Sequence, residues 1–330
     1  MEDSKAKKKV SVLIPCYNAE KWLRETLDCC LRQTYKNIEV VLVDDGSTDG
    51  SLAIAREYEQ CDPRVHVYSQ PNSGGCRARN LAFEKSTGDY IMYLDADDLM
   101  SDNKIEVQVK RLEEEGDPKA VAVCPWETFT DTLPSKHTER FLYKDYPTGL
   151  DLIEEAWYNN EWFVVSCYLT TCQLIAEAGP WDERLTKVQD GEFFCRVLSK
   201  ASHVMYCPSA MFCYRIGYAS VSRGNKFVEN KLNSALLGRI LCKQTVLPLR
   251  DTPCVRRGLA RNFSIVLLTS PYGSRWYLEA KKQIEQLGER PHHPSPSPVV
   301  AIVEKIIGFD RLLHLKMLLG KWKHSRYCCL

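Results

Sequence analysis

The sequence lacks several features that mark particular classes of protein. No apolar run approaches the roughly 20 residues that a membrane-spanning helix needs. Residues 1–10 are charged and lack the apolar stretch of a signal peptide. Lys and Arg number 44 and Asp and Glu number 43, so no excess of positive charge indicates a nucleic-acid partner. These absences predict a cytoplasmic protein that binds no nucleic acid.

Common metal and nucleotide motifs are also missing. The 15 cysteines include no C-x-x-C pair, and the chain has no H-E-x-x-H string, so a zinc site has no support. We therefore interpret the cysteines as reduced thiols, many of them buried. The chain has no G-x-G and no Walker string, which argues against a dinucleotide dehydrogenase and a P-loop enzyme.

The first part of the chain alternates short apolar runs with segments of helical spacing. This alternation predicts right-handed crossovers and a mostly parallel sheet flanked by helices. From residue 225 to 287 the pattern is mainly helical. We predict an α/β domain over 1–222, a helical extension over 223–290, a Pro-rich linker over 291–298 and a basic amphipathic tail over 299–330. The expected strands cover residues 10–14, 38–43, 65–68, 90–94 and 120–123.

Polar and acidic residues follow three of these strands. Pro15-Cys16-Tyr17-Asn18 follows the first strand, Asp44-Asp45-Gly46 the second and Asp95-Ala96-Asp97-Asp98 the fourth. Asp, Asn and Gly are ordinary turn residues, so a single one of these loops could be turn chemistry alone. Several acidic loops at the carboxyl ends of parallel strands instead favour a crevice that binds a cation and a nucleotide.

Asp95 and Asp97 are the candidate metal ligands. Residues two apart in an extended segment point to the same side, so both carboxylates can reach one ion. Such hard oxygen ligands suit Mg²⁺ or Mn²⁺, which complete their shells with water and phosphate oxygens. The alternative is a loop of solvated acids.

Taken in order, these motifs resemble the family 2 glycosyltransferases of GT-A fold. The resemblance is carried by Val10–Asn18, Val41–Asp49, the Asn72-Ser73-Gly74 and Ala78-Arg79-Asn80 strings and Tyr93–Asp98. It is close over residues 9–112 and looser to residue 222. It implies a GT-A-like nucleotide-binding fold with a mainly helical C-terminal extension.

The resemblance also implies roles for individual residues. Tyr17 and the Asp44-Asp45 pair would hold the base and ribose of a nucleotide sugar, which is expected to be UDP-linked. Which of the two aspartates contacts the base stays open. Asp95 and Asp97 would form the D-x-D that binds the ion bridging the donor diphosphate, and Arg79 would support the sugar-phosphate side. The other residues assigned to the nucleotide sugar are Pro15, Asn18 and Ala96.

Val188–Arg196 resembles the family segment whose Asp is the catalytic base, and only Asp190 carries over because Gln189 stands where the family often has Glu. The implied activity is inverting transfer of a sugar to an acceptor hydroxyl of a glycan or glycolipid. The absence of a Q-x-x-R-W string favours addition of one sugar per acceptor. Glu192 is the local alternative as base, and helix capping is the alternative role of Asp190. A nucleotidyltransferase and a non-catalytic carbohydrate-binding relative are the competing functions.

The tail carries six Lys or Arg and two acidic residues, with apolar residues at helical spacing. A basic amphipathic helix of this kind can lie on an anionic membrane surface. It can equally be a helix that packs on the rest of the chain. We expect peripheral contact with the inner face of a membrane, where the acceptor would be lipid-linked.

Overall fold

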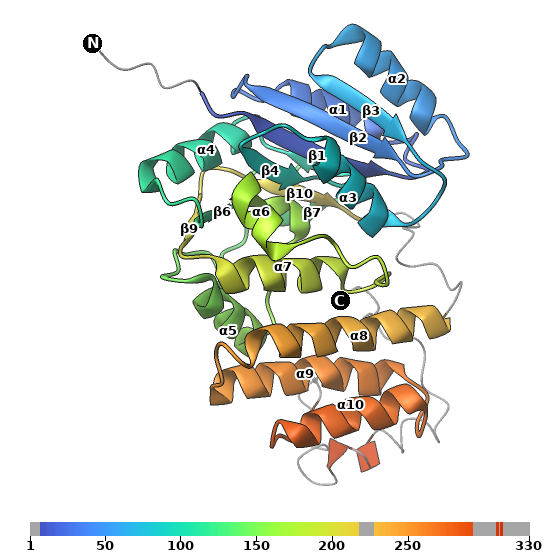
Figure 1. The fold of residues 1–330 in the computed structure, drawn as a ribbon, viewed down its shortest axis with the longest axis vertical. Helices are drawn as coiled ribbons and strands as arrows, with labels where there is room; N and C mark the ends of the chain where they lie inside the picture. The colour runs from blue at the N-terminus through green and yellow to red at the C-terminus, as the bar shows by residue number, and fades with distance from the viewer. Residues whose placement is uncertain (1–6, 218–227, 293–307, 310, 313–330) are drawn as a thin grey trace. The chain divides into compact units, whose positions relative to one another are not determined.

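The computed structural model describes residues 7–217, 228–292, 308, 309, 311 and 312. The chain forms two compact units whose segments alternate along the sequence (Figure 1). Unit 1 comprises Met1–Leu152, Phe163–Glu183 and Arg196–Gly217, and unit 2 comprises Ile153–Trp162, Arg184–Cys195 and Tyr218–Leu330. The domain boundary predicted after residue 222 lies outside the described residues and stays a prediction.

Unit 1 contains a seven-stranded sheet of order β3-β2-β1-β4-β8-β6-β9. The strands β3, β2, β1 and β4 run parallel, as does the β6-β9 pair, whereas β8 is antiparallel to both β4 and β6. The predicted α/β class with a mostly parallel sheet is therefore confirmed. The strands are β1 (Val10–Cys16), β2 (Ile38–Asp44), β3 (Val65–Ser69), β4 (Tyr90–Tyr93), β6 (Val121–Val123), β8 (Tyr168–Thr171) and β9 (Val204–Tyr206).

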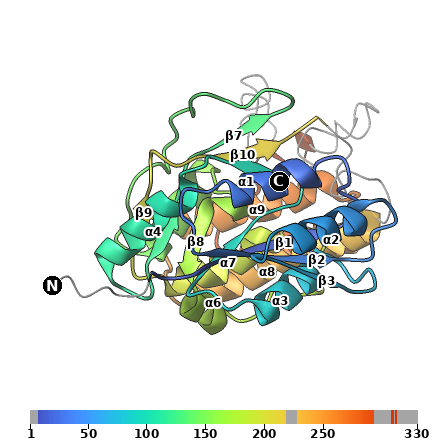
Figure 2. The same cartoon turned by 90° about the horizontal axis from the view of Figure 1, so that it is seen from above.

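Helices cover both faces of this sheet, which is why its central strands are continuous apolar runs. All seven residues of β2 are buried. Figure 2 shows α1 and α2 on one face and α3 and α6 on the other. The helix α4 packs against β6 and β8. The bounds are α1 (Leu23–Leu31), α2 (Ser51–Cys61), α3 (Gly75–Lys85), α4 (Lys104–Glu115) and α6 (Cys172–Ala178).

A second, three-stranded sheet has the order β5-β10-β7 and also belongs to unit 1. Its strands are β5 (Leu99–Met100), β10 (Phe212–Arg215) and β7 (Trp126–Phe129). Because β5 follows the Asp95–Asp98 loop directly, its pairing with β10 places Arg215 beside that loop. The 3₁₀ turn η1 (Val165–Cys167) precedes β8, and α5 (Gly149–Asn159) and α7 (Gln189–Lys200) each contribute residues to both units.

The described residues from 228 to 292, which belong to unit 2, are mainly helical, as predicted for residues 225–287. The helices α8 (Val228–Val246), α9 (Pro253–Thr269) and α10 (Arg275–Gln286) lie side by side (Figure 1). Thr252 and Ser274 cap α9 and α10 by accepting hydrogen bonds from the amides of Val255 and Tyr277. In the described part of the chain no helix combines the length and apolarity needed to cross a membrane. Nearly all of the predicted tail, 299–330, lies outside the described residues.

Candidate active site

The loops that follow β1 and β2 are joined by hydrogen bonds. Cys16 and Asp44 are register partners at the ends of their strands. The amide of Asp45 donates to the Cys16 carbonyl at 2.8 Å, and the amide of Thr48 donates to Asn18 Oδ1 at 2.8 Å. Asn18 has a φ of 50°, a left-handed conformation that asparagine tolerates. Asn18 therefore links the loop after β1 to the loop after β2.

The side chains predicted to meet the nucleotide differ in exposure. Tyr17 is 37% exposed, so its side chain is accessible to a stacking partner. Pro15 is half-buried within β1, and Ala96 is buried, with its carbonyl accepting a hydrogen bond from Thr26 Oγ1 at 3.1 Å. Only Tyr17 of these three therefore presents a side chain to solvent.

Asp44 and Asp45 are both buried but have different partners. Asp45 accepts from Gln70 Nε2 at 2.7 Å, from the Ser73 amide at 2.8 Å and from the Gly74 amide at 2.8 Å. Its carboxylate thereby fixes the loop that begins α3. Asp44 Oδ2 accepts from the Ser47 amide and Ser69 Oγ, whereas its buried Oδ1 has no hydrogen-bond partner among the described residues. A buried acceptor without a partner is uncommon and points to a missing donor.

Asp95, Asp97 and Arg79 lie together at the carboxyl end of β4. Arg79 Nη2 on α3 donates to Asp95 Oδ1 at 2.8 Å, and its guanidinium lies 4.8 Å from the centre of the Trp181 ring. Its side chain is 11% exposed and that of Asp95 is 32% exposed. No described side chain donates a hydrogen bond to the Asp97 carboxylate. The D-x-D thus has one carboxylate that is paired with arginine and one that has no side-chain donor among the described residues.

Negative charge accumulates on this loop. Burial, reinforced by the charge of Asp95, raises the pKa of Asp97 to about 6. Burial and the neighbouring Asp97 raise the pKa of Asp98 well above its usual range. The Asp97 and Asp98 carboxylates are therefore difficult to ionise together, and a cation bound beside them would favour their ionised forms.

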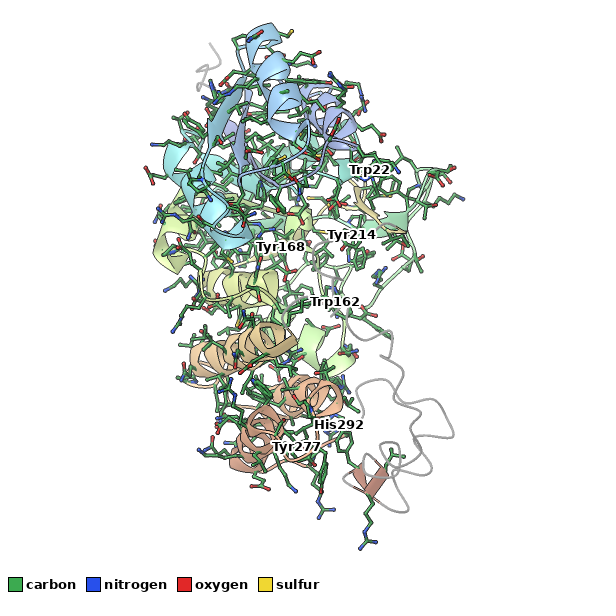
Figure 3. All side chains as sticks on the ribbon, turned by 90° about the vertical axis from the view of Figure 1, so that its right-hand side faces the viewer. Trp22, Trp162, Tyr168, Tyr214, Tyr277 and His292 are labelled. Carbon is green, nitrogen blue, oxygen red and sulfur yellow. The ribbon has the colours of Figure 1, made fainter. Side chains whose placement is uncertain are left out.

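Arg215 on β10 forms hydrogen bonds to the loop that contains the D-x-D. Its Nε donates to the Asp97 carbonyl at 2.7 Å, its Nη2 to Glu25 Oε2 at 2.7 Å and its amide to Asp98 Oδ1 at 2.8 Å. The side chain is 4% exposed, and its guanidinium lies 4.2 Å from the centre of the Trp22 ring. Figure 3 labels Trp22 and Tyr214, the residue before Arg215. Arg215 is not among the site residues predicted from the sequence, because its contacts lie more than 100 residues away along the chain.

The donor set suits a hard divalent ion that is partly held by a ligand. Among the described residues, no cluster of three or more His, Cys, Asp or Glu side chains forms a complete metal site. Mg²⁺ and Mn²⁺ often bind through one or two carboxylates together with phosphate oxygens. The carboxylates of Asp97, which has no side-chain donor among the described residues, and of the neighbouring Asp95 fit that pattern.

Asp190 belongs to unit 2. It is the second residue of α7, so it is not the N-cap of that helix. Its side chain is exposed and has no hydrogen bond or ion pair within the described part of the chain. Glu192, the local alternative, is 3% exposed. Of the two carboxylates, Asp190 is the accessible one.

Comparison with known proteins places this site in a family. Residues 11–174 match the family Glycosyl transferase family 2. Glycosyltransferase GlyA of Streptococcus pneumoniae is 29% identical over 222 residues, which are 65% of this chain and 32% of GlyA. An uncharacterized glycosyltransferase of Haemophilus influenzae is 45% identical over 101 residues, 30% of this chain and 40% of that protein. The chain thus spans well under half the length of these relatives.

The fold is also that of a solved glycosyltransferase structure. S. aureus TarS (residues 1–349), crystallised in complex with UDP-GlcNAc, aligns with a TM-score of 0.61 and 16% identity. The alignment covers 86% of this chain and 93% of the TarS chain. Identity this low establishes the fold alone, which is GT-A. Through residues 11–174 and this fold, the chain belongs to the family 2 glycosyltransferases.

Proposed function

We propose that the chain is an inverting, metal-dependent glycosyltransferase that moves a sugar from a UDP-linked donor to a hydroxyl of a glycan or glycolipid. The observation that carries this proposal is the pair of Asp95 and Asp97 carboxylates at the strand edge where the buried Oδ1 of Asp44 has no donor among the described residues. One ligand that brings an N–H group, a diphosphate and a divalent ion would satisfy all of these groups.

Asp44, rather than Asp45, is assigned to the base. The Asp45 carboxylate already accepts three hydrogen bonds, whereas Asp44 Oδ1 has none from the described residues. A uracil ring N–H is a donor that a carboxylate oxygen accepts well. Tyr17 directly follows Cys16, the register partner of Asp44, and its exposed ring supplies a stacking face. The TarS structures, one with UDP-GlcNAc and one with UDP, show this fold binding such ligands in another protein.

Asp95 and Asp97 would hold Mn²⁺ or Mg²⁺, which when bound would neutralise the charge of the leaving diphosphate. Arg79 keeps Asp95 in place through its ion pair. Arg215 fixes the backbone of the loop, so the Asp97 carboxylate is presented without rearrangement.

Asp190 is the proposed general base. In an inverting displacement the acceptor oxygen attacks opposite the leaving group, so a carboxylate other than the metal ligands must take the acceptor proton. The exposed Asp190 carboxylate, free of partners among the described residues, is available for that task. The buried Glu192 is not.

One relative bears on the acceptor. The putative teichuronic acid biosynthesis glycosyltransferase TuaG of Bacillus subtilis is 42% identical over 102 residues. That name supports a role in polysaccharide biosynthesis for this chain, with single-sugar transfer because the Q-x-x-R-W string is absent.

The nature of the product tests the reaction class. The full chain is incubated with a panel of UDP-sugars and Mn²⁺, and both UDP and pyrophosphate are measured. A glycosyltransferase releases UDP, whereas a nucleotidyltransferase forms or consumes pyrophosphate. Chelation should abolish UDP release, and Mn²⁺ or Mg²⁺ should restore it. Full turnover in excess chelator would refute metal dependence.

The base is tested by Asp190→Asn, which keeps the side chain's shape and removes its basicity. We expect kcat to fall by roughly 10²-fold or more while donor binding stays intact. Asp251→Asn is the matched control, because Asp251 is an exposed carboxylate of unit 2 that pairs with Arg256. Normal turnover by Asp190→Asn, or a product that retains the donor's anomeric configuration, would contradict the assignment.

A further inference from the structure

The turn that precedes Asp190 has a strained backbone. Val188 has a φ of 60°, a left-handed conformation that is unfavourable for a β-branched residue. The other non-glycine residues with positive φ in the described part of the chain are Asn18 and Asn160, and asparagine adopts this conformation readily. Strain of this kind persists only where the surroundings hold it, and it is common at functional sites.

One hydroxyl on α8 holds this turn. Ser234 Oγ accepts from the amides of Thr186 and Lys187, each at 2.8 Å, and donates to the Lys187 carbonyl at 2.8 Å. Both lone pairs and the proton of the hydroxyl are therefore used. Ser234 is 2% exposed, so water does not replace these bonds.

Gly238, one helical turn further along α8, lets the helix approach Val188 closely. A Cβ at this position would lie 3.3 Å from Val188 Cβ, closer than side chains normally pack. After another turn, Cys242 Sγ lies 3.7 Å from the Gly191 carbonyl oxygen. Ser234, Gly238 and Cys242 are spaced four residues apart and so share one face of α8, which we call the α8 stripe.

The α8 stripe contacts the backbone on both sides of Asp190. It binds Thr186 and Lys187 before that residue and approaches Gly191 after it. The Asp190 carboxylate itself has no hydrogen bond or ion pair from the described residues, so the backbone that carries it determines which positions it can reach. We propose that the α8 stripe positions Asp190 for proton abstraction, with Ser234 and Gly238 as positioning residues, a role that depends on the proposed function of Asp190 as the base.

The variants Ser234→Ala and Gly238→Ala test this role. Ser234→Ala removes all three bonds to the turn, and Gly238→Ala pushes Val188 away while favouring the helix itself. We expect each to lower kcat by about tenfold or more without changing KM for the donor, because small misplacements of a catalytic group are costly. Should Ser234→Ala fail to fold, Gly238→Ala carries the test.

Ser264→Ala is the matched control for a merely structural effect. Ser264 is a fully buried serine on α9 of the same unit, and its Oγ donates to the Ala260 carbonyl and accepts from the His292 amide. It should lower the melting temperature as Ser234→Ala does and leave kcat unchanged. An equal loss of kcat in Ser264→Ala would overturn the proposal.

The double variant Ser234→Ala/Asp190→Asn distinguishes positioning from a separate contribution. If Ser234 acts through Asp190, its removal should cause no further loss of kcat once Asp190 is Asn. Multiplied losses, or normal kcat in both stripe variants while Asp190→Asn is impaired, would overturn the positioning role and leave the proposed base intact. Normal kcat in Asp190→Asn itself would instead overturn the base and this inference together.

Discussion

At the scale of single residues, the Asp97 carboxylate occupies a position that lowers the stability of the ligand-free fold when it is ionised. Burial and the charge of Asp95 raise its pKa to about 6, above the ordinary value for aspartate. Between about pH 4 and 6 the folded state therefore binds more protons than the unfolded state. The contribution of Asp97 to stability consequently falls as the pH rises through this range, and above it the ionised group destabilises the ligand-free fold.

Replacing Asp97 with Asn should therefore stabilise the metal-free protein near pH 7.5, by about 1–3 kcal/mol, since Asn has the same shape and no charge. The gain should disappear towards pH 4, where Asp97 is protonated in both states. Glycosyl transfer should be lost at the same time. Thermal melting of both proteins across this pH range is the measurement.

Asp95→Asn is the control for that prediction, because it also lowers the repulsion but breaks the ion pair with Arg79. Its gain in stability near pH 7.5 should be the smaller one. A lower melting temperature for Asp97→Asn than for the natural sequence at pH 7.5 would show that the carboxylate is stabilised rather than strained.

At the scale of elements, the adjacent Asp44 and Asp45 at the carboxyl end of β2 have different roles. Asp45 fixes the loop before α3, and Asp44 leaves one oxygen without a partner in the described part of the chain. The division follows from the extended backbone, in which adjacent residues point to opposite sides. One side chain therefore meets α3 while the other meets the strand-end loops.

Asp44→Asn should weaken UDP binding with little loss of stability. The bonds from the Ser47 amide and Ser69 Oγ will keep the amide oxygen at the Oδ2 position, which leaves an NH₂ group at the Oδ1 position. That group would face the uracil N–H donor to donor. We expect the Kd for UDP to rise by about tenfold or more, measured by calorimetry.

Asp45→Asn should have a different signature. An amide cannot accept from the Gln70 side chain and from the Ser73 and Gly74 amides together, so we expect a loss of about 1–3 kcal/mol in stability. If Asp45→Asn keeps its stability and loses UDP binding while Asp44→Asn binds normally, the two roles are reversed.

At the scale of the whole molecule, the tail is the segment whose role depends on a surface outside the chain. We expect the full chain to bind vesicles that contain anionic lipid and to bind neutral vesicles weakly, because the tail combines basic and apolar residues. A variant ending at Pro298 should lose this binding, and because it also lacks the buried Phe309 and Leu312 it should melt at a lower temperature. Equal sedimentation of both proteins with anionic vesicles would contradict peripheral membrane contact.

Five of the seven strands of the main sheet, and the loops that carry the candidate site, could be predicted from the amino-acid sequence, whereas β8 and β9 were not. Apolar runs such as residues 38–43 predict buried strands because helices cover both faces of a parallel sheet. The acidic residues after β2 and β4 could be assigned to one edge for the same reason, since parallel strands end together. The Asp190 segment was found only through its resemblance to a family, because an acid in the first turn of a helix is locally unremarkable.

Which atoms of those loops accept hydrogen bonds depends on the packing of the folded chain. The Asp45 carboxylate accepts from Gln70 and from the amides of Ser73 and Gly74, more than 20 residues away, whereas Asp44 accepts from Ser47 and Ser69. Arg215 reaches Glu25 across 190 positions, and Ser234 reaches Lys187 across 47. Such contacts leave no period in the sequence, because they depend on how strands and helices pack rather than on local spacing. The strained φ of Val188 is hidden for the same reason: its own residue type disfavours it, and the neighbouring α8 stripe holds it in place.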